Sequence, residues 1–473
     1  MTENSNLNIA VLGGGPGGYA AAFLAADLGM KVTLIDREQN PGGVCLYRGC
    51  IPSKALLHVA KLITESQHAK NWGIEFGEPK IDVARLRSFK DGVVNKLTGG
   101  LGQLSKQRKV QYIRGEASFE NSSTLRVKKH DGNEESITFD RIIIATGSRP
   151  AVIPKLKLDS PRMLDSTSAL DLQDVPGTLL VVGGGYIGLE LGTVYAALGS
   201  KVSVVEMTPG LLPGADRDLV LPLHKRLEKS FDSILLNTTV TAVKEEPNGI
   251  RVCFEGKDVK EREKVFDKVL VSVGRKPNSE IAGLDRTQVR VGGRGFLQVN
   301  KHLQTEDSAI YAIGDVVGEP MLAHKASHEG RTAVEHMAGH KVAFEPNAIP
   351  AVVFTDPEIA WVGLTETQAQ KENREIKIAK FPWAASGRAM TLDRTEGITK
   401  IIIDPSTERV LGVGIVGVGA GDLISEGVLA IEMAALAQDV ALTIHPHPTL
   451  SETLMQSAEV FFGTSTDLYR PRK

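Results

Sequence analysis

Cysteine is scarce in this chain of 473 residues, which contains only Cys45, Cys50 and Cys253. Three cysteines cannot form a structural disulfide framework for a chain of this size. In a reducing compartment, two cysteines as close as Cys45 and Cys50 are more typical of catalysis or metal binding than of structural cross-linking. The third, Cys253, is most simply a small buried residue in a β-hairpin.

The sequence also lacks an excess of charge and a long apolar run. Its 55 Lys and Arg against 57 Asp and Glu leave a net charge of −2, which argues against nucleic acid or an acidic membrane surface as the main partner. The one basic cluster is the tail at 469–473, which a solvated terminus explains. No apolar run approaches the roughly 18–20 residues of a membrane-spanning helix.

The polar start of the sequence, residues 1–8, has neither the apolar core of an export signal nor the Arg-rich character of a transit peptide. We therefore expect a cytoplasmic protein, or the mature form of an organelle enzyme. Neither nucleic acid nor a membrane is expected as its partner.

An internal repeat is the most informative pattern in the sequence. Two copies align with an offset of 170 residues, and each runs from an apolar strand through a GxGxxG motif and a helical stretch to a second strand that ends in an acid. The motifs are Gly13–Gly18 and Gly183–Gly188, and the acids Asp36 and Glu206 each follow 18 residues after the last glycine. Each copy is thus a complete βαβ dinucleotide-binding fingerprint.

The glycines of this fingerprint have separate physical tasks. The first makes a sharp turn, the second lets the backbone approach a pyrophosphate at the helix N-terminus, and the third allows close helix–strand packing. The acid accepts hydrogen bonds from a ribose diol, and a carboxylate at Glu206 would repel a 2′-phosphate, so the second copy favours NAD over NADP. Glycine-rich turns without a ligand are the alternative, which would have to occur twice.

The remaining strands complete these units. Runs at 141–145, 268–273 and 309–313 end in turn sequences, and from about residue 349 onward strand-like and helical runs alternate as in a separate α+β domain. We expect an α/β protein with two Rossmann-like dinucleotide-binding domains and a C-terminal α+β domain. The expected boundaries are 1–150 with 280–348 returning to it, 151–279, and 349–473.

The cysteine pair follows the first nucleotide unit. Two cysteines five residues apart can close a disulfide if the intervening loop turns back, and Gly49 helps it to turn. A helix that begins near Ile51 places Cys50 at a helix N-terminus, where a thiolate is stabilised. Two buried free cysteines or half of a metal site are the alternatives, but a metal site needs further ligands and no second Cys or His pair lies nearby. We therefore expect a redox pair and no metal.

The segment 445–452 can supply a base. A thiol with a pKa of about 8.5 is mostly protonated at neutral pH, so its reaction requires proton removal. His447 is suited to this, with Glu452 on its far nitrogen to fix the tautomer. The pattern Thr449-x-x-Glu452 is also a capping box that opens the last helix. From the spacing alone, both interpretations remain open.

Together these segments resemble the pyridine nucleotide–disulfide oxidoreductase family over nearly the whole chain. Within that family, the branch that oxidises dihydrolipoamide is the most similar. Two departures are Tyr47-Arg48, where an Asn-led pair is more common, and Pro446, where Ala is usual; neither removes a chemical group. The segments that carry the resemblance are both nucleotide motifs and residues 42–54, 145–148, 274–278, 312–315, 321–325, 356–363 and 445–452.

The resemblance implies FAD in the first nucleotide unit, NAD in the second, and a homodimer formed through the C-terminal domain. It implies that Cys45 meets the substrate and Cys50 the flavin, and that His447 and Glu452 serve the cysteine pair of the other subunit. His445 would be a structural neighbour. Lys54 and Glu190 would pair beside the flavin, although surface charge is the simpler explanation of each alone. The implied FAD residues are Gly13, Gly15, Gly18, Asp36, Lys54, Ala117, Gly147, Asp315 and Ala323. The implied NAD residues are Gly183, Gly185, Tyr186, Ile187, Gly188, Glu206, Val240 and Gly274.

The implied substrate is a dihydrolipoyl group on the acyltransferase of a 2-oxoacid dehydrogenase complex or on a glycine-cleavage carrier protein. Reductases of the glutathione or mercuric type are the alternatives within the family. The first usually has a basic NADP site and a single histidine before Pro-Thr, and the second has extra C-terminal cysteines. A non-catalytic flavoprotein that serves as a binding subunit is the alternative from another class; the intact cysteines, base and nucleotide motifs argue against it.

Overall fold

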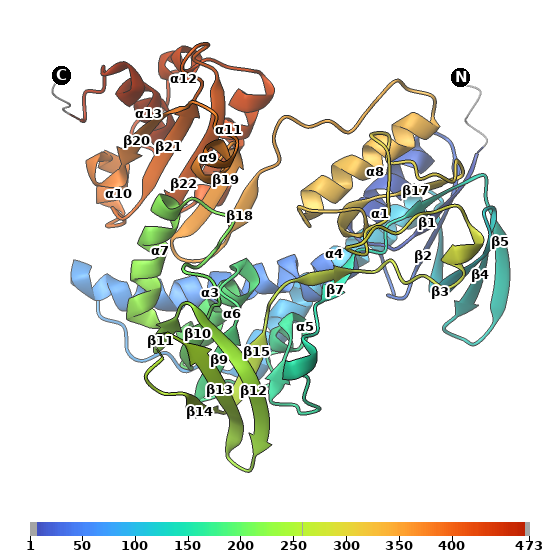
Figure 1. Cartoon of the computed structure of the whole chain (residues 1–473), viewed down its shortest axis with the longest axis horizontal. Helices are drawn as coiled ribbons and strands as arrows, with labels where there is room; N and C mark the ends of the chain where they lie inside the picture. Colours follow the sequence, from blue (N-terminus) through green and yellow to red (C-terminus); the bar gives the residue numbers. More distant parts are fainter. Residues whose placement is uncertain (1–6, 258, 469–473) are drawn as a thin grey trace.

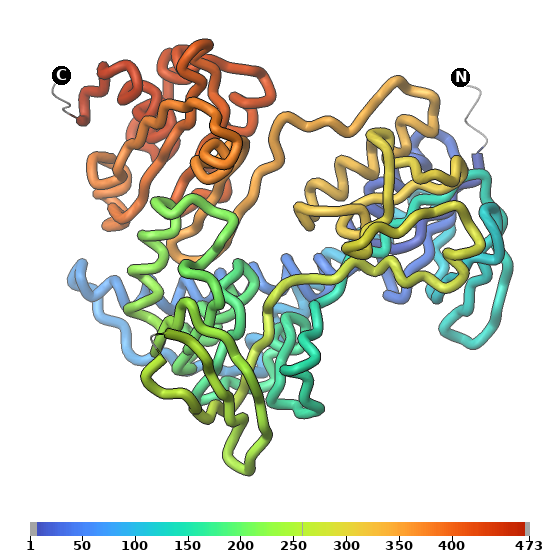
Figure 2. The backbone as a smooth tube through the Cα atoms, in the orientation of Figure 1, coloured from blue at the N-terminus to red at the C-terminus, as the bar shows by residue number. Residues whose placement is uncertain are grey.

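The computed structural model describes residues 7–257 and 259–468. Two sequence-based expectations concern residues outside this range. They are the lack of a targeting signal in the first six residues and the solvated basic tail at 469–473. Figure 1 shows the arrangement of the helices and strands, and Figure 2 follows the chain through them. Among the described helices, none is both long and apolar enough to cross a bilayer.

The first nucleotide-binding unit is built on a seven-stranded sheet in the order β17-β6-β1-β2-β3-β4-β5. The strands from β17 to β3 pair in parallel, whereas β3, β4 and β5 pair antiparallel. The strands are β1 (Asn8–Leu12), β2 (Lys31–Asp36), β3 (Gln111–Asn121), β4 (Thr124–Lys129), β5 (Glu134–Thr138), β6 (Arg141–Ile144) and β17 (Ile310–Ala312). Four consecutive residues of β1 are buried, as is typical of a parallel strand that is covered on both faces.

Two helices from opposite ends of this unit's sequence pack together. They are α1 (Pro16–Asp27) and α8 (Ala323–Met337), which lie side by side in Figure 1. A side chain at Gly330 would come within 2.6 Å of the carbonyl oxygen of Gly17, so their close approach requires glycine. The segment that follows residue 280 therefore returns to the first sheet and packs on its glycine-rich helix.

The second nucleotide-binding unit has a five-stranded parallel sheet in the order β11-β10-β9-β15-β8. A separate three-stranded antiparallel sheet, β12-β13-β14, belongs to the same part of the chain. The chain enters this unit through β7 (Ser148–Pro150) and leaves it through β16 (Arg275–Pro277), and these two strands pair with each other. The other elements are β8 (Met163–Leu164), α5 (Ser166–Leu170), β9 (Thr178–Val182), α6 (Tyr186–Ala197), β10 (Lys201–Val205), α7 (Arg217–Ser230), β11 (Ser233–Leu235), β12 (Thr238–Glu246), β13 (Gly249–Gly256), β14 (Glu263–Phe266) and β15 (Lys268–Val271).

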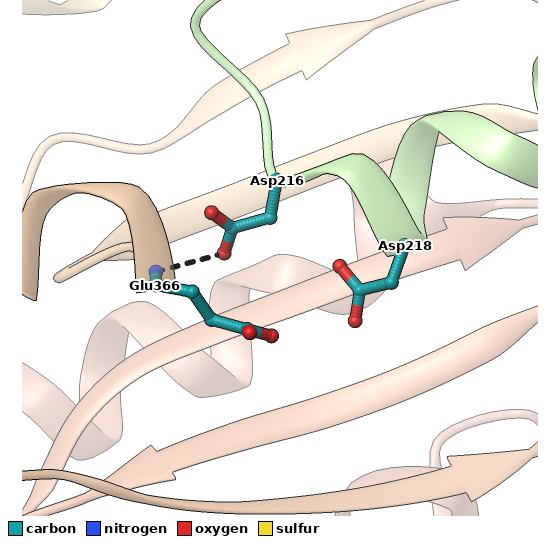
Figure 3. A group of neighbouring side chains, drawn as sticks. All are labelled: Asp216, Asp218 and Glu366. Carbon is teal, nitrogen blue, oxygen red and sulfur yellow. Dashed lines mark hydrogen bonds between the residues drawn. The ribbon is translucent and has the colours of Figure 1, made fainter. Parts of the chain in front are cut away.

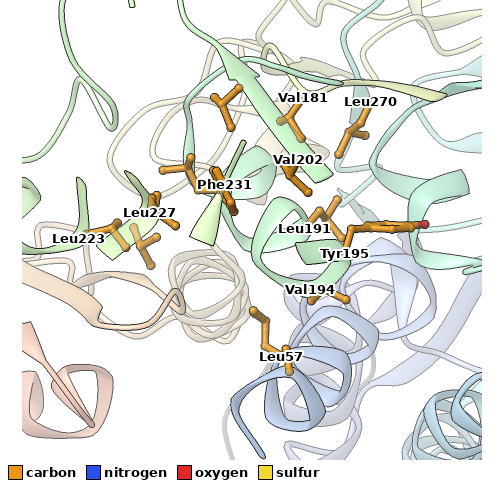
Figure 4. Close-up of a cluster of buried hydrophobic side chains, with 14 of the residues drawn as sticks. Leu57, Val181, Leu191, Val194, Tyr195, Val202, Leu223, Leu227, Phe231 and Leu270 are labelled. Atoms are coloured by element: carbon orange, nitrogen blue, oxygen red, sulfur yellow. The ribbon is translucent and has the colours of Figure 1, made fainter. Parts of the chain in front are cut away.

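The helices that follow β2 connect the two units. They are α2 (Gly43–Arg48), α3 (Cys50–His68) and α4 (Val83–Gln107). The buried face of α3 packs on α6, and its Leu57 belongs to the same apolar cluster as Val194 and Val202 (Figure 4). The helix that begins with Cys50 is therefore anchored in the core of the second unit.

The C-terminal region forms a five-stranded antiparallel sheet in the order β18-β19-β22-β21-β20. Helices α11, α12 and α13 contribute to its main apolar cluster, while α7 of the second unit contacts β19 and β22. A long connection, residues 338–350, crosses from α8 to this sheet (Figure 2). The elements are β18 (Ala351–Val353), β19 (Glu358–Gly363), α9 (Glu366–Lys371), β20 (Lys377–Pro382), α10 (Gly387–Thr391), β21 (Ile398–Ile403), β22 (Val410–Gly417), α11 (Ala420–Glu432), α12 (Ala437–Leu442) and α13 (Glu452–Phe462).

The expected fold class is confirmed. Two Rossmann-like units, each with a strand, a glycine-rich turn, a helix and a second parallel strand, precede an α+β region. The domain boundaries at 150, 279 and 349 remain predictions, because α3 belongs to the first unit by sequence and to the second by its packing.

Candidate active site

A cavity of about 490 Å³ lies between the two nucleotide-binding units. Its wall includes the first glycine-rich turn, both cysteines of the pair and the start of α6. The residues that line it all fall between Gly13 and Ala326, so the described part of the C-terminal region contributes none of its wall. The two cysteines and the first glycine-rich motif therefore line the same cavity.

The first glycine-rich turn has the geometry that a dinucleotide requires. Gly13 has a φ of +106°, and a Cβ there would overlap the carbonyl oxygen of Ala145. A Cβ at Gly18 would overlap the carbonyl oxygen of Gly13, so this position must be glycine for α1 to pack. At Gly15, the N-cap of α1, a Cβ would meet no atom closer than 3.9 Å. The turn leaves space for a phosphate at the helix N-terminus, as FAD needs.

The second turn repeats this geometry. Gly183 has a φ of +107°, and a Cβ there would lie 2.7 Å from the carbonyl oxygen of Ser272. A Cβ at Gly188 would overlap the carbonyl oxygen of Gly183, whereas a Cβ at Gly185 would meet nothing within 4 Å. These residues fit the pyrophosphate of a second dinucleotide in the same way.

The acid that ends the second strand of each unit lies against its glycine turn. Asp36 accepts a hydrogen bond from the backbone N–H of Gly14 at 2.5 Å, and Glu206 accepts one from Gly184 at 2.7 Å. Each carboxylate is therefore next to the position where a ribose diol would lie beside the pyrophosphate. The first arginine after Glu206 is Arg217, whose guanidinium donates to the backbone carbonyls of Leu211, Leu212 and Ala215. The guanidinium of Arg217 would therefore have to break these hydrogen bonds before it could bind a 2′-phosphate.

The cysteine pair spans the junction of two helices. Cys45 lies in α2, and Cys50 is the first residue of α3. Gly49 joins them, and a Cβ there would come within 2.8 Å of the carbonyl oxygen of Val44, so the tight turn requires glycine. The structure has both cysteines as thiols; Cys45 is partly buried and Cys50 is exposed to the cavity.

The two thiols have different acidities. A hydrogen bond from Cys45, reinforced by the ammonium of Lys54, lowers the pKa of Cys50 to about 7, although burial and the carboxylate of Glu190 oppose this. The same hydrogen bond and burial raise the pKa of Cys45. Because a helix N-terminus also favours a thiolate, Cys50 is the sulfur of the pair that carries negative charge near neutral pH.

An ion pair lies beside the cysteines. Lys54 Nζ is 2.8 Å from Glu190 Oε2, and the Glu190 side chain is only 4% exposed. The other oxygen of Glu190 accepts a hydrogen bond from the backbone N–H of Phe354 at 3.0 Å, and Lys54 Nζ lies 4.6 Å from the centre of the Phe354 ring. The pair thus joins α3, α6 and the segment after β18. Phe354 was not anticipated from the sequence, since its contact is a backbone N–H that bonds 164 residues away.

The other residues implied for FAD lie partly in the cavity. Asp315 accepts a hydrogen bond at 2.5 Å from Ser148, whose hydroxyl accepts one at 2.7 Å from Arg275. Ala117 lies on β3 opposite Val127 and is not among the residues that line the cavity. Those that do line it are Gly13, Gly15, Asp36, Lys54, Gly147, Asp315 and Ala323.

Only two of the residues implied for NAD line this cavity, namely Tyr186 and Ile187 at the start of α6. Val240 lies on β12. Gly274 follows β15 with a φ of +119°, and a Cβ there would meet no atom within 4 Å. The remainder surround the second glycine turn, so the structure separates the two dinucleotide positions while α6 reaches the cavity between them.

The histidine segment settles the ambiguity about Glu452, because its two oxygens have different partners. Oε1 lies 2.9 Å from His447 Nδ1, and Oε2 accepts a hydrogen bond from the backbone N–H of Thr449 at 2.7 Å. The expected capping box is wrong, because α13 begins only at Glu452 with Ser451 as its N-cap and no side-chain cap hydrogen bond. The contact of Glu452 with Thr449 instead holds the turn before the helix, beside the pairing with histidine. The His447 side chain is 78% exposed, whereas His445 is buried against Glu426.

Three carboxylates elsewhere in the molecule come within 4.8 Å of one another: Asp216, Asp218 and Glu366 (Figure 3). Lys400, which is 1% exposed, places its ammonium 2.7 Å from Asp216 and 2.8 Å from each of the other two. The lysine therefore already supplies the compensating charge. The cluster connects α7 of the second unit to the C-terminal sheet.

Comparisons with known proteins cover nearly the whole chain. Residues 7–330 match the family model described as pyridine nucleotide-disulphide oxidoreductase, and residues 349–458 match the dimerisation domain of that family. The dihydrolipoyl dehydrogenase of Haemophilus influenzae is 50% identical over 468 residues, which are 99% of this chain and 98% of that protein. The dihydrolipoyl dehydrogenase of Vibrio cholerae is 48% identical with the same coverage.

Solved structures agree with this. LpdA from Mycobacterium tuberculosis superimposes with a TM-score of 0.88 at 28% identity, covering 96% of this chain and 99% of that one. The HOCl-induced flavoprotein disulfide reductase RclA from Escherichia coli has a TM-score of 0.84 at 29% identity, covering 94% and 98%. The similarity therefore extends over the whole architecture and is not confined to a nucleotide motif.

Proposed function

The chain belongs to the pyridine nucleotide-disulphide oxidoreductase family, and from this premise we propose that it acts as a dihydrolipoyl dehydrogenase. It oxidises a dihydrolipoyl group to the cyclic disulfide and reduces NAD⁺ to NADH. The observation that carries this proposal is the position of Cys45 and Cys50 in a cavity between two dinucleotide-binding units. The relatives of this name at 50% and 48% identity support the substrate.

FAD and NAD, the cofactors of this family, supply the route by which two electrons leave the cysteine pair as NADH. The first glycine turn, Asp36 and Asp315 would hold FAD, and the second turn with Glu206 would hold NAD. The carboxylate of Glu206 and the hydrogen-bonded guanidinium of Arg217 both favour NAD over NADP.

The chain's own residues handle protons and sulfur. His447, whose Nδ1 is held by Glu452, takes a proton at Nε2 from one substrate thiol. The thiolate attacks Sγ of Cys45 in the oxidised pair, the Cys45–Cys50 bond breaks, and Cys50 leaves as a thiolate. The second substrate sulfur then displaces Cys45, and the proton of this second thiol passes to the departing Cys45 sulfur. This closes the lipoyl disulfide and leaves two electrons on the cysteine pair.

The surroundings of Cys50 suit its role as the leaving group. At that step Cys45 is bonded to the substrate sulfur and has no S–H to donate, but the ammonium of Lys54 and the N-terminus of α3 still favour the thiolate of Cys50. The raised pKa of Cys45 suits the sulfur that is attacked and later reprotonated.

We propose that the base acts across a homodimer. The chain matches a dimerisation domain at 349–458, and the cavity is lined by residues 13–326 of its own chain, so His447 belongs to a different part of the subunit. The C-terminal region that carries His447 also has exposed apolar side chains that a second subunit would cover; they are Leu429, Met433, Leu442 and Ile444. His447 and Glu452 of one subunit then serve Cys45 of the other.

The partner that brings the substrate is a lipoyl domain of an acyltransferase component, or the lipoyl carrier protein of glycine cleavage, in the cytoplasm. The enzyme would regenerate the oxidised lipoyl group of a 2-oxoacid dehydrogenase or glycine cleavage complex.

The test is a steady-state assay of purified protein with dihydrolipoamide and either NAD⁺ or NADP⁺. We expect NADH formation, at least about tenfold weaker use of NADP⁺, and loss of turnover in Cys45→Ser. A matched variant, Cys253→Ser, should keep wild-type activity because that cysteine lies on β13 outside the cavity. Reduction of oxidised glutathione or Hg(II) in preference to lipoamide would contradict the proposal.

A further inference from the structure

The two residues that distinguish this cysteine loop, Tyr47 and Arg48, both reach back to the loop that follows β2. The hydroxyl of Tyr47 donates to the backbone carbonyl of Asn40 at 3.1 Å and accepts from its N–H at 3.2 Å. The guanidinium of Arg48 forms an ion pair with Glu38. Their side chains are partly shielded, at 38% exposed for Arg48 and 24% for Glu38. The cysteine helix α2 is therefore tied to residues 38–40 by two separate side chains.

The same loop is tied on its other side to the first nucleotide motif. The backbone N–H of Glu38 donates to Asp36 at 2.9 Å, and the N–H of Gly42 donates to the carbonyl of Gly14 at 2.7 Å. Tyr112 of β3 fixes the carbonyl of Glu38 with a further hydrogen bond at 2.9 Å. A continuous set of contacts thus runs from the carboxylate of Asp36 through Glu38 and Arg48 to the turn before Cys50.

We propose that the Arg48–Glu38 ion pair is a clasp that couples occupation of the FAD site to the geometry of the cysteine pair, with Arg48 as a positioning residue. This rests on the proposed FAD site. Both side chains line the cavity that also holds Gly13, Asp36 and the two cysteines, so they lie between the nucleotide end and the sulfur end of one site.

The coupling has to act in both directions. If the clasp holds the loop after β2 in the shape that FAD binds, breaking it weakens FAD binding; equally, bound FAD stiffens α2. Because Cys45 lies on α2 and Cys50 begins α3, a loosened α2 also moves Cys45 away from Cys50 and weakens the hydrogen bonding that lowers the pKa of Cys50. Because that hydrogen bond is the largest cause that lowers the pKa of Cys50, the pKa of Cys50 rises when the clasp is absent.

The experiment measures FAD binding to apoprotein by quenching of flavin fluorescence, in wild type, Arg48→Met, Glu38→Gln and the double variant. We expect each single variant to weaken FAD binding by about fivefold. The double variant should be no weaker than either single one, since both remove the same ion pair.

The matched control is Arg37→Met, which removes a charge beside the same cavity. The Arg37 side chain is 73% exposed and lies 3.8 Å from Glu116, and among the described residues it forms no ion pair with α2. A clasp predicts little change in this variant. If the positive charge merely attracted the diphosphate, Arg37→Met and Arg48→Met would weaken FAD binding alike and Glu38→Gln would strengthen it, and this pattern would overturn the proposal.

A second readout separates coupling from simple loss of affinity. In holoenzyme saturated with FAD and reduced by two electrons, the long-wavelength absorption of a thiolate beside flavin reports the ionisation of Cys50. We expect its pH midpoint to move upward in Arg48→Met and Glu38→Gln and to stay in Arg37→Met. An unchanged midpoint in the clasp variants would refute the coupling to the cysteines. Failure of the wild-type apoprotein to bind FAD would instead overturn the proposed function itself.

Discussion

At the scale of single residues, the surroundings of Cys45 and Cys50 give two thiols of the same kind different pKa values. Cys50 stands at the start of α3 beside Lys54, and its interaction with Cys45 of α2 lowers the pKa of Cys50 while raising that of Cys45. The sequence predicts the helix start and the nearby lysine. It cannot predict that Glu190 raises the pKa of Cys50 against the effect of Lys54, because Glu190 lies on α6, 140 residues further along the chain.

This balance predicts opposite effects of two substitutions on the pH midpoint of the thiolate–flavin absorption in reduced holoenzyme. Lys54→Met removes a charge that lowers the pKa of Cys50, so the midpoint should rise by about 0.5–1 unit. Glu190→Gln removes a charge that raises it, so the midpoint should fall. Lys61→Met, two turns further along α3 and paired with Glu65, is the control that should leave the midpoint in place. Shifts of the same sign in both site variants would contradict this electrostatic account.

Glu452 shows where residue spacing stops being informative. The pattern Thr449-x-x-Glu452 predicts a helix cap and the pattern His447-x₄-Glu452 predicts a dyad, and nothing in either spacing ranks one above the other. A carboxylate has two oxygens, and the structure assigns one to each partner. The contact with Thr449 therefore exists beside the pairing with His447, but it caps no helix, because α13 begins only at Glu452.

At the scale of elements, the last glycine of each turn was predictable because its close contact lies within one βαβ unit, whereas Gly13 and Gly183 approach Ala145 and Ser272 far along the chain. The overlap of a Cβ at Gly18 with the carbonyl of Gly13 involves residues five apart, and the same holds for Gly188 and Gly183. The role of Phe354 was not predictable, because it joins elements that lie far apart in the sequence through a backbone N–H that any residue type would offer. The packing of α3 on α6 was missed for the same reason.

The ion cluster that connects α7 to the C-terminal sheet predicts a large effect on stability. Lys400→Met leaves Asp216, Asp218 and Glu366 close together without the ammonium that bonds all three. We expect the free energy of unfolding to fall by about 3 kcal/mol at pH 7, measured by urea denaturation. Lys380→Met is the matched control: it contacts two of the same carboxylates but is 38% exposed, so its loss should cost much less.

The cluster also predicts the direction of a pH effect. Burial raises the pKa values of Asp216 and Asp218, but hydrogen bonds to lysine outweigh this and hold both pKa values below their usual range. Lys400 acts on both carboxyls, and Lys380 acts on Asp218 as well. A carboxyl with a lowered pKa stabilises the fold above its unfolded pKa of about 3.9 and loses that contribution as the pH falls further. The difference between wild type and Lys400→Met should therefore shrink between about pH 5 and pH 3. A difference that stays constant over this range would show that lost packing, not charge, causes the destabilisation.

At the scale of the whole molecule, one subunit carries all the groups that the proposed reaction requires but does not assemble them. The cysteines face a cavity between the two nucleotide-binding units, while His447 is exposed on the C-terminal region, and that region lends no described residue to the cavity wall. In a two-fold symmetric dimer, each C-terminal region can lie against the other subunit's cavity, so two complete sites form together.

This arrangement predicts that two inactive variants restore activity when they share a dimer. Cys45→Ser and His447→Gln should each be inactive as homodimers, because each lacks one group in both sites. Co-expressed with different affinity tags, half of the dimers are mixed, and each mixed dimer has one site with both groups intact and one with neither. We expect about a quarter of the wild-type activity in the unfractionated mixture, measured as NADH formation from dihydrolipoamide, and about half in mixed dimers purified through both tags. Doubly tagged Cys45→Ser dimers control for the tags and should stay inactive. Mixed dimers without activity would mean that His447 does not act on the partner's cysteines, since a base that served its own chain would leave both of their sites incomplete.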